Sequence, residues 1–154
     1  MPKLLIFLLA VCLLSRAASN AADSPVAAVQ RLFDAMAAHD VETARARFTP
    51  EASLIAVRAD GASTVMPHEQ WLSHLSESKD KWLERMWNPT VLEHGSIAVV
   101  WAQYDFHLNG RFTHCGVDSV DLLKTSDGWK ISGISFTRET AHCPSSPLGP
   151  PKMN

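Results

Sequence analysis

The sequence predicts a single α+β domain in which helices and two short strands come first and four long antiparallel strands follow. Two observations lead to this class. In the first half of the chain, apolar residues recur at three- and four-residue spacing, which indicates amphipathic helices. From Trp82 onward, long runs are bounded by the turn pairs His94-Gly95, Asn109-Gly110 and Asp127-Gly128, which indicate β-hairpins.

The helical and strand signals place the elements in a definite order. The Ser24-Pro25 pair begins the first helix as N-cap and first helical residue, and Asp40 caps the second helix. The predicted elements are helices over 24–39 and 41–48, short strands over 54–58 and 64–66, a helix over 68–78, and long strands over 82–93, 96–108, 111–125 and 129–138. Pro89 suits an edge strand, because proline cannot donate a backbone hydrogen bond to a neighbouring strand.

Composition limits the classes of function. The 154 residues suffice for one domain, and 46% hydrophobic against 19% charged residues is typical of a packed core rather than a disordered chain. The formal net charge is -2, and no segment is strongly basic. We therefore expect no nucleic-acid partner, and no membrane partner for the mature form.

Both ends of the chain are predicted to lie outside the folded domain, which we assign to residues 22–142. Residues 1–21 have the layout of a signal peptide cleaved near Ala21: Lys3, an apolar run of 11 residues and then small residues. A lipid anchor at Cys12 is less favoured, because Val11 precedes it where a small residue is needed. We expect a secreted or periplasmic protein with a disordered, proline-rich tail over 143–154.

Strand alternation predicts a buried polar cluster. If Asn109-Gly110 is a two-residue turn, Asp105 lies opposite His114, and Asp118 shares their face of the sheet. The same face carries Val120, Leu122, Trp129 and Ile131, which must be buried, so we expect it to be the face that the helices cover. Burying charged groups without a function is unfavourable, which makes this cluster the candidate site.

Three functions are compatible with such a cluster. The first is binding of a small organic ligand in a cavity, as is typical of apolar pockets with a few convergent polar groups. The residues expected to line or close this cavity are Trp101, Gln103, Trp71, Trp82 and Met86. The second is an acid–base enzyme, an isomerase, dehydratase or cyclase, in which Asp118 or the Asp105–His114 pair moves protons. The third is a closed core in which Asp105 and His114 form a satisfied ion pair.

We expect no cofactor and no metal. Asp105, His107 and His114 lie within reach of one another on one predicted hairpin, and histidine with a carboxylate is acceptable to zinc. Their spacing, however, matches no recognised ligand pattern.

Two further expectations concern the cysteines and the outer sheet face. Cys115 and Cys143 can form a disulfide in an oxidising compartment, or remain as one buried and one free thiol. Alternation places four apolar side chains among polar ones on the outer face, which favours a homodimer through it, with a monomer as the alternative. These side chains are Tyr104, Phe106, Ile134 and Phe136.

The segment from Gly95 to Glu139 also carries a family resemblance. It contains His-Cys-Gly-Val-Asp over 114–118 ahead of Gly-Trp-Lys-Ile over 128–131. In these motifs, and in its element order over 24–138, the chain resembles the NTF2-like or SnoaL-like superfamily, and within it an exported, lumazine-binding-like subgroup. The resemblance implies a cone: a curved antiparallel sheet of four long and two short strands wrapped around three N-terminal helices. The superfamily includes ketosteroid isomerase, whose Tyr and two Asp have no counterparts in matching positions here, so no catalytic residue is carried over.

Overall fold

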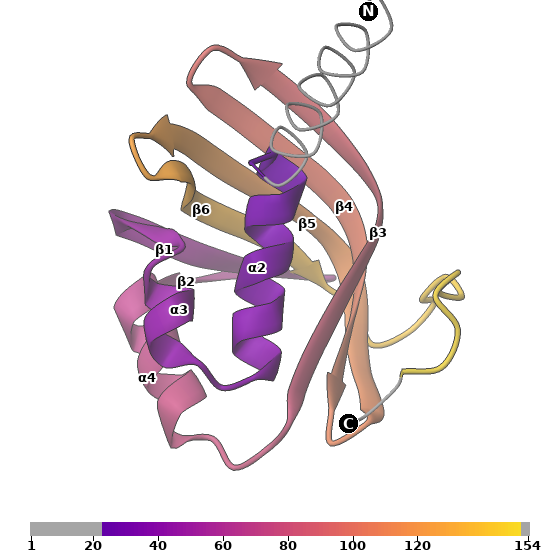
Figure 1. Cartoon of the computed structure of the whole chain (residues 1–154). Coiled ribbons are helices and arrows are strands. Elements are labelled where there is room, and N and C mark those ends of the chain that lie inside the picture. Colours follow the sequence, from indigo (N-terminus) through magenta and orange to yellow (C-terminus); the bar gives the residue numbers. More distant parts are fainter. Residues whose placement is uncertain (1–22, 152–154) are drawn as a thin grey trace, which may run out of the picture.

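A computed structural model describes residues 23–151, and the predicted signal peptide lies outside them. The elements are α2 (Pro25–Ala37), α3 (Val41–Arg45), β1 (Phe48–Arg58), β2 (Ser63–Pro67), α4 (His68–Glu77), β3 (Trp82–His94), β4 (Ile97–Leu108), β5 (Arg111–Thr125) and β6 (Gly128–Arg138). Figure 1 shows a curved sheet with the helices gathered on one side. The structure is thus α+β, as the sequence predicts.

The six strands form one sheet in the order β2-β1-β6-β5-β4-β3. The last four strands are the predicted antiparallel meander, and β3, which contains Pro89, lies at an edge. The expectation of an all-antiparallel sheet is wrong, because β1 pairs with β6 in parallel. The split into four long and two short strands also differs, because β1 is 11 residues long. Its first residue, Phe48, already pairs with Ile131 of β6.

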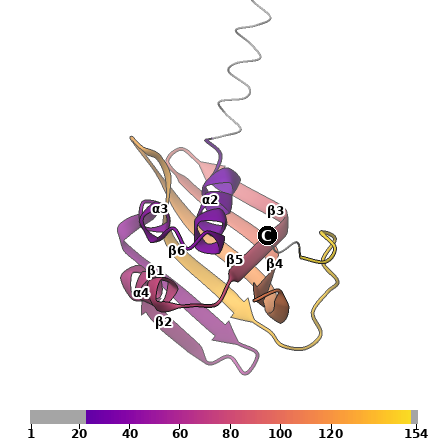
Figure 2. The ribbon, with the colours of Figure 1, turned by 60° about the horizontal axis from the view of Figure 1, so that its bottom comes forward.

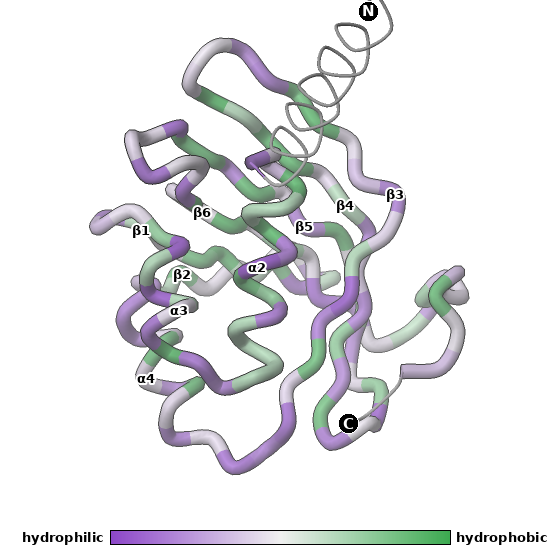
Figure 3. The backbone as a smooth tube through the Cα atoms, in the orientation of Figure 1, coloured by the Kyte–Doolittle hydropathy of each residue, from purple (hydrophilic) through white to green (hydrophobic). Residues whose placement is uncertain are grey.

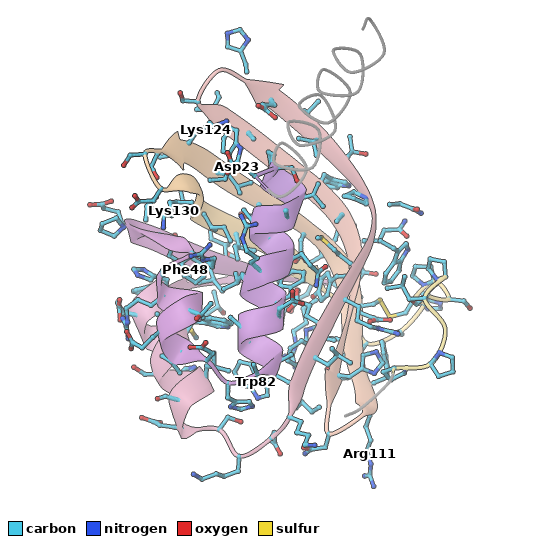
Figure 4. All side chains as sticks on the ribbon, viewed as in Figure 1. Asp23, Phe48, Trp82, Arg111, Lys124 and Lys130 are labelled. Atoms are coloured by element: carbon cyan, nitrogen blue, oxygen red, sulfur yellow. A yellow bond between two sulfur atoms is a disulfide. The ribbon has the colours of Figure 1, made fainter. Side chains whose placement is uncertain are left out.

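Helix α2 covers the concave face of the sheet (Figures 1 and 2). The Ser24 hydroxyl accepts a hydrogen bond from the Ala27 amide at 3.2 Å and caps the helix, as predicted. Val29, Leu32 and Met36 are buried on its inner side. Asp23 lies 3.8 Å from the Lys124 ammonium at the end of β5, which ties the start of α2 to the sheet (Figure 4).

A β-bulge at Thr113 overturns the predicted facing of β4 and β5. His107 pairs with Phe112 as the two-residue turn requires, but beyond Thr113 the register shifts, and Phe106 pairs with His114. Asp105 therefore lies opposite Cys115 on the outer face and makes no pair with His114. The physical reason is burial: the shifted register places Val100 and Tyr104 inside, with 0% and 1% exposure.

A second bulge, at Ser132, shifts the register between β5 and β6. Leu122 pairs with Ile131, whereas Asp121 pairs with Gly133, so the side chains of β6 after the bulge lie on the opposite face from the one that simple alternation predicts. Trp129 and Ile131 are buried in the core as predicted. Beyond the bulge, Ile134 and Phe136 turn inward, although alternation alone places them outside. Figure 3 shows how hydrophobic and hydrophilic residues are distributed along the strands.

The segment after β6 is tied back to the sheet. Cys115 and Cys143 form a disulfide with an Sγ–Sγ distance of 2.02 Å. The Arg85 guanidinium donates a hydrogen bond to the Gly149 carbonyl at 2.8 Å. The segment runs beside β3 and β4, on the side away from α2 (Figures 1 and 2). It therefore packs against the outer face at the end of the sheet where Asp105 lies.

The outer face exposes apolar side chains other than those expected. Tyr104, Phe106, Ile134 and Phe136, on which the dimer expectation rested, lie inside instead. The exposed apolar residues of this face include Leu92, Ile97, Trp101 and Leu123. A homodimer through this face stays a prediction, now resting on these residues. Among the described residues, no helix has the length and apolar character needed to cross a membrane.

Candidate functional site

The inner face of the sheet and the helices enclose a cavity of about 430 Å³. This volume is within the range of roughly 300–1,000 Å³ that is usual for small-molecule sites. The lining residues come from α2, α4 and the strands β1, β3, β4, β5 and β6. They are Leu32, Phe33, Met36, Leu54, Ala56, Trp71, His74, Trp82, Glu84, Tyr104, Phe106, His114, Asp118, Ile134, Phe136 and Arg138.

A continuous series of ring contacts forms much of the cavity wall. Trp71 of α4 meets Trp82 at a centroid distance of 6.3 Å, and Trp82 meets Phe106 at 6.0 Å. The series continues through His114 and Tyr104 to Phe136, with centroid distances of 5.0, 5.8 and 6.3 Å. Trp82 lies at the start of β3, near the C-terminal end of α2 (Figure 4). Such a wall suits a flat ring system, which can stack on or pack edge-on against the rings.

Two carboxyl groups meet inside this wall. Glu84 of β3 and Asp118 of β5 are hydrogen-bonded to each other. Asp118 has 2% exposure, and burial raises its pKa to about 7. Burial, followed by the charge of Asp118, also raises the pKa of Glu84 well above its usual value. Part of the Glu84 residue is exposed, but its carboxyl group is enclosed, and this environment sets the pKa.

Near neutral pH the two carboxyl groups therefore hold at least one proton between them, with Glu84 as the donor and Asp118 as the acceptor. The Asp118 oxygen Oδ2 is buried without a hydrogen-bond partner. An unpaired buried acceptor is rare in folded proteins and unfavourable, so it marks this pair as the chemical centre of the cavity.

His114 borders the same space in its neutral form. Burial and the nearby charge of Arg138 lower the pKa of His114 to about 4. The Thr113 hydroxyl donates to the Phe106 carbonyl at 3.1 Å, so it accepts from His114 Nδ1, which lies 2.8 Å away. The hydrogen of the neutral imidazole thus sits on Nδ1, and Nε2 carries a lone pair.

The exposed charged and polar residues of the lining are Arg138 and His74. Arg138 is the last residue of β6, and His74 belongs to α4. Asp118 and Tyr104 are buried and form the inner end of the cavity, whereas Arg138 and His74 are solvent-exposed residues of its lining.

The structure brings some of the sequence-predicted site residues together and separates others. Asp118, His114, Trp71 and Trp82 line the cavity. Met86 packs against the hydrophobic core without lining the cavity. Among the described residues, no cluster of three or more His, Cys, Asp and Glu side chains could hold a metal ion.

Three predicted residues are placed wrongly by alternation, because the Thr113 bulge turns them outward. Trp101 is 54% exposed on the outer face, and Gln103 accepts a hydrogen bond from the Trp87 indole there. Asp105 does not pair with His114. It receives two hydrogen bonds from Arg85, at 2.8 and 2.6 Å, and also lies 3.2 Å from His107 Nε2.

Sequence reasoning missed Glu84, the aromatic residues Tyr104, Phe106 and Phe136, and Arg138. The sequence did indicate Glu84, because Trp82, Glu84 and Met86 occupy every second position of one strand and therefore share a face. The tryptophan and methionine were expected to close the cavity, so alternation alone places the carboxylate between them. The inward facing of the other four depends on the two bulges.

A curved sheet that holds an aromatic-walled cavity against its helices defines the class of cone-shaped α+β domains with an internal pocket. The family model described as "putative lumazine-binding" matches residues 21–137, and the chain belongs to this family. Its fold is that of solved NTF2-like proteins. No curated protein shows significant sequence similarity to the chain.

Solved structures share the fold at low sequence identity. An NTF2-like protein of unknown function from Shewanella baltica is 17% identical with a TM-score of 0.55, over 78% of this chain and 91% of that one. A protein with a cystatin-like fold from Nostoc punctiforme is 14% identical with a TM-score of 0.60, over 80% and 91%. A "putative dehydratase" of the NTF2-like family from Streptomyces avermitilis is 16% identical with a TM-score of 0.62, over 80% and 99%. At these identities the similarity shows the fold alone.

Proposed function

We propose that the protein binds a small organic ligand in the aromatic-walled cavity. The observation that carries this proposal is the buried Asp118 Oδ2 atom, which has no partner and belongs to a residue that lines a cavity of about 430 Å³. A group arranged in this way gains a hydrogen bond when a ligand enters. The description of the family as lumazine-binding supports a planar heterocycle as the ligand.

We also propose that the chain is exported and works outside the cytoplasm. The predicted signal peptide and the disulfide between Cys115 and Cys143 support this location, since disulfides persist in oxidising compartments. Edman sequencing of the exported chain tests it. A mature N-terminus near Ala22 is expected, and an intact Met1 would contradict the proposal.

Native mass spectrometry of the chain, purified after export without denaturation, tests ligand binding directly. A retained small molecule would support the proposal and identify its chemistry. If none is retained, titration with lumazine, followed by protein fluorescence, provides the second test. Saturable quenching is expected, and its absence together with a ligand-free mass would contradict the proposal.

Two tryptophans provide a matched pair of variants for the titration. Trp71→Ala removes part of the cavity wall, and it should weaken lumazine binding at least tenfold. Trp101→Ala removes a 54% exposed ring from the outer face and should leave the affinity unchanged. Equal effects of the two substitutions would place the ligand outside the cavity.

A second candidate function is acid–base catalysis on the bound ligand. It is favoured by the raised pKa of Asp118, about 7, because a group that titrates near the working pH can both remove and return a proton. Deuterium incorporation from heavy water into the recovered ligand measures such a transfer. Asp118→Asn should abolish the incorporation, and a ligand that stays undeuterated with the unmodified protein would argue for binding alone.

A further inference from the structure

The buried polar atoms of the cavity offer lone pairs rather than hydrogens. Asp118 Oδ2 is an acceptor without a partner, and the Nε2 atom of neutral His114 is a second acceptor. The Tyr104 hydroxyl uses its hydrogen to donate to the Thr137 carbonyl at 2.7 Å. The proton held by Glu84 is engaged by Asp118. A ligand that satisfies this inner end must therefore bring hydrogen-bond donors.

The inner end also carries unbalanced negative charge when Asp118 is ionised. The Arg85 guanidinium, on the outer face, is engaged by Asp105 at 2.6 Å. The charge of Arg138 lowers the pKa of His114 but does not contribute to the pKa shifts of Asp118 and Glu84. An enclosed carboxylate without a counter-charge is costly, and a cation bound next to it removes that cost. The surrounding aromatic faces attract cations as well.

We infer that the ligand carries a cationic group with N–H donors, such as an amidinium or a protonated aminoazine, on an aromatic body, and that Asp118 Oδ2 binds this group. An amidinium has two N–H donors in one plane, the geometry that carboxylates bind best. The aromatic body packs against the series of rings from Trp71 to Phe136. This inference rests on the proposed function and names the ligand chemistry of the same cavity.

Three matched probes test the polar group of the ligand: 2-naphthamidine, 2-naphthamide and 2-naphthoate. They share one bicyclic body, and their polar groups are a cation with N–H donors, a neutral amide and an anion that only accepts hydrogen bonds. Isothermal titration at pH 8, with the exported chain and its disulfide intact, gives the affinities. The amidine should bind at least tenfold more tightly than the amide, and the naphthoate should bind least.

Two carboxylate variants on the same strand complete the test. Asp118→Asn keeps the size and removes the charge, so the preference for the amidine over the amide should disappear. Asp121→Asn changes an exposed carboxylate of β5 on the outer face, and it should leave the preference intact. A preference that survives in Asp118→Asn would overturn the inference.

The pH dependence provides a readout that shape alone would not give. Protonation of Asp118, with a pKa of about 7, should weaken amidine binding about tenfold between pH 8 and pH 6. Of the other titratable groups of the lining, His114 has a pKa of about 4 and Tyr104 has a raised pKa, so neither changes its charge between pH 6 and pH 8. Glu84 holds its proton more tightly than an ordinary carboxyl group, and Arg138 and His74 are the exposed groups of the lining. Affinity for the neutral amide should stay flat over the same range.

The outcomes separate this inference from the proposed function. If the amide or the naphthoate binds as tightly as the amidine, the cavity binds small molecules but the inference is wrong. If none of the three probes binds, the inference is again wrong, and native mass spectrometry and the lumazine titration decide on the proposed function independently.

Discussion

Asp118→Asn should make the protein more stable at high pH, because the native structure holds this carboxyl group where its charged form is unfavourable. In the unfolded chain the pKa of an aspartate has its ordinary value of 3.8, and in the folded protein burial raises it to about 7. Between these two values the native state binds more protons than the unfolded state. The free energy of unfolding therefore falls as the pH rises through this window.

The size of the effect follows from the two pKa values. At 1.36 kcal/mol for each pH unit, the difference between 3.8 and about 7 amounts to at most about 4 kcal/mol. Asparagine of similar size can still accept the hydrogen from Glu84 and carries no charge. The variant should therefore gain stability over the unmodified protein progressively from pH 4 to pH 8, and change little more above that.

Urea unfolding at pH 4, 5, 6, 7 and 8, followed by tryptophan fluorescence, measures the difference between the two proteins. Asp121→Asn serves as the control, because Asp121 is exposed on the same strand. A stability difference between Asp118→Asn and the unmodified protein that is independent of pH, or that shrinks as the pH rises, would refute the assignment of Asp118 as an enclosed carboxyl group with a raised pKa.

Three further predictions concern the rest of the fold. Cys143→Ser opens a disulfide that encloses 27 intervening residues and should lower the free energy of unfolding by about 3–4 kcal/mol; an unchanged urea midpoint would contradict this. Gly116→Ala would place a Cβ 2.1 Å from the Thr137 carbonyl oxygen and should lower the free energy of unfolding by about 1–3 kcal/mol. Gly133→Ala is the control, because the nearest atom to its Cβ would be 3.8 Å away and its stability should hardly change. Equal melting temperatures of the two variants would show that β5 and β6 are not in close contact at Gly116. In native mass spectrometry the exported chain should have the mass of a dimer, and the exposed-face substitution Trp101→Lys should convert it to a monomer. A monomeric mass for the unmodified chain would contradict the dimer prediction.

The order of the elements was predictable because its signals are local. A capping serine before a proline, apolar spacing of three and four, and turn pairs such as Asn109-Gly110 act within a few residues of chain. These signals placed α2, α4 and the four-strand meander close to where the structure has them. The family resemblance was carried by motifs of the same short range.

Only part of the site was predictable, because the face on which each side chain lies depends on the register between neighbouring strands. One unpaired residue at Thr113 inverts every side chain of β4 relative to β5, and Ser132 does the same on β6. The sequence did contain a conflict that points to a bulge. Alternation counted from the Asn109-Gly110 turn predicts that Gln103 and Asp105 are buried, whereas hydrophobicity predicts that Val100 and Tyr104 are buried. In the folded structure, Val100 and Tyr104 are the buried residues.

The sequence by itself therefore determined the fold class, the order of the elements and the presence of Asp118 and His114 on an inner face. Only the tertiary structure decided which groups meet there. The contact between Glu84 and Asp118 joins strands that are not neighbours in the sheet, since β4 lies between them. Such a contact depends on the curvature of the sheet and on both bulges at once, and these properties arise from the packing of the whole domain rather than from any segment of the chain.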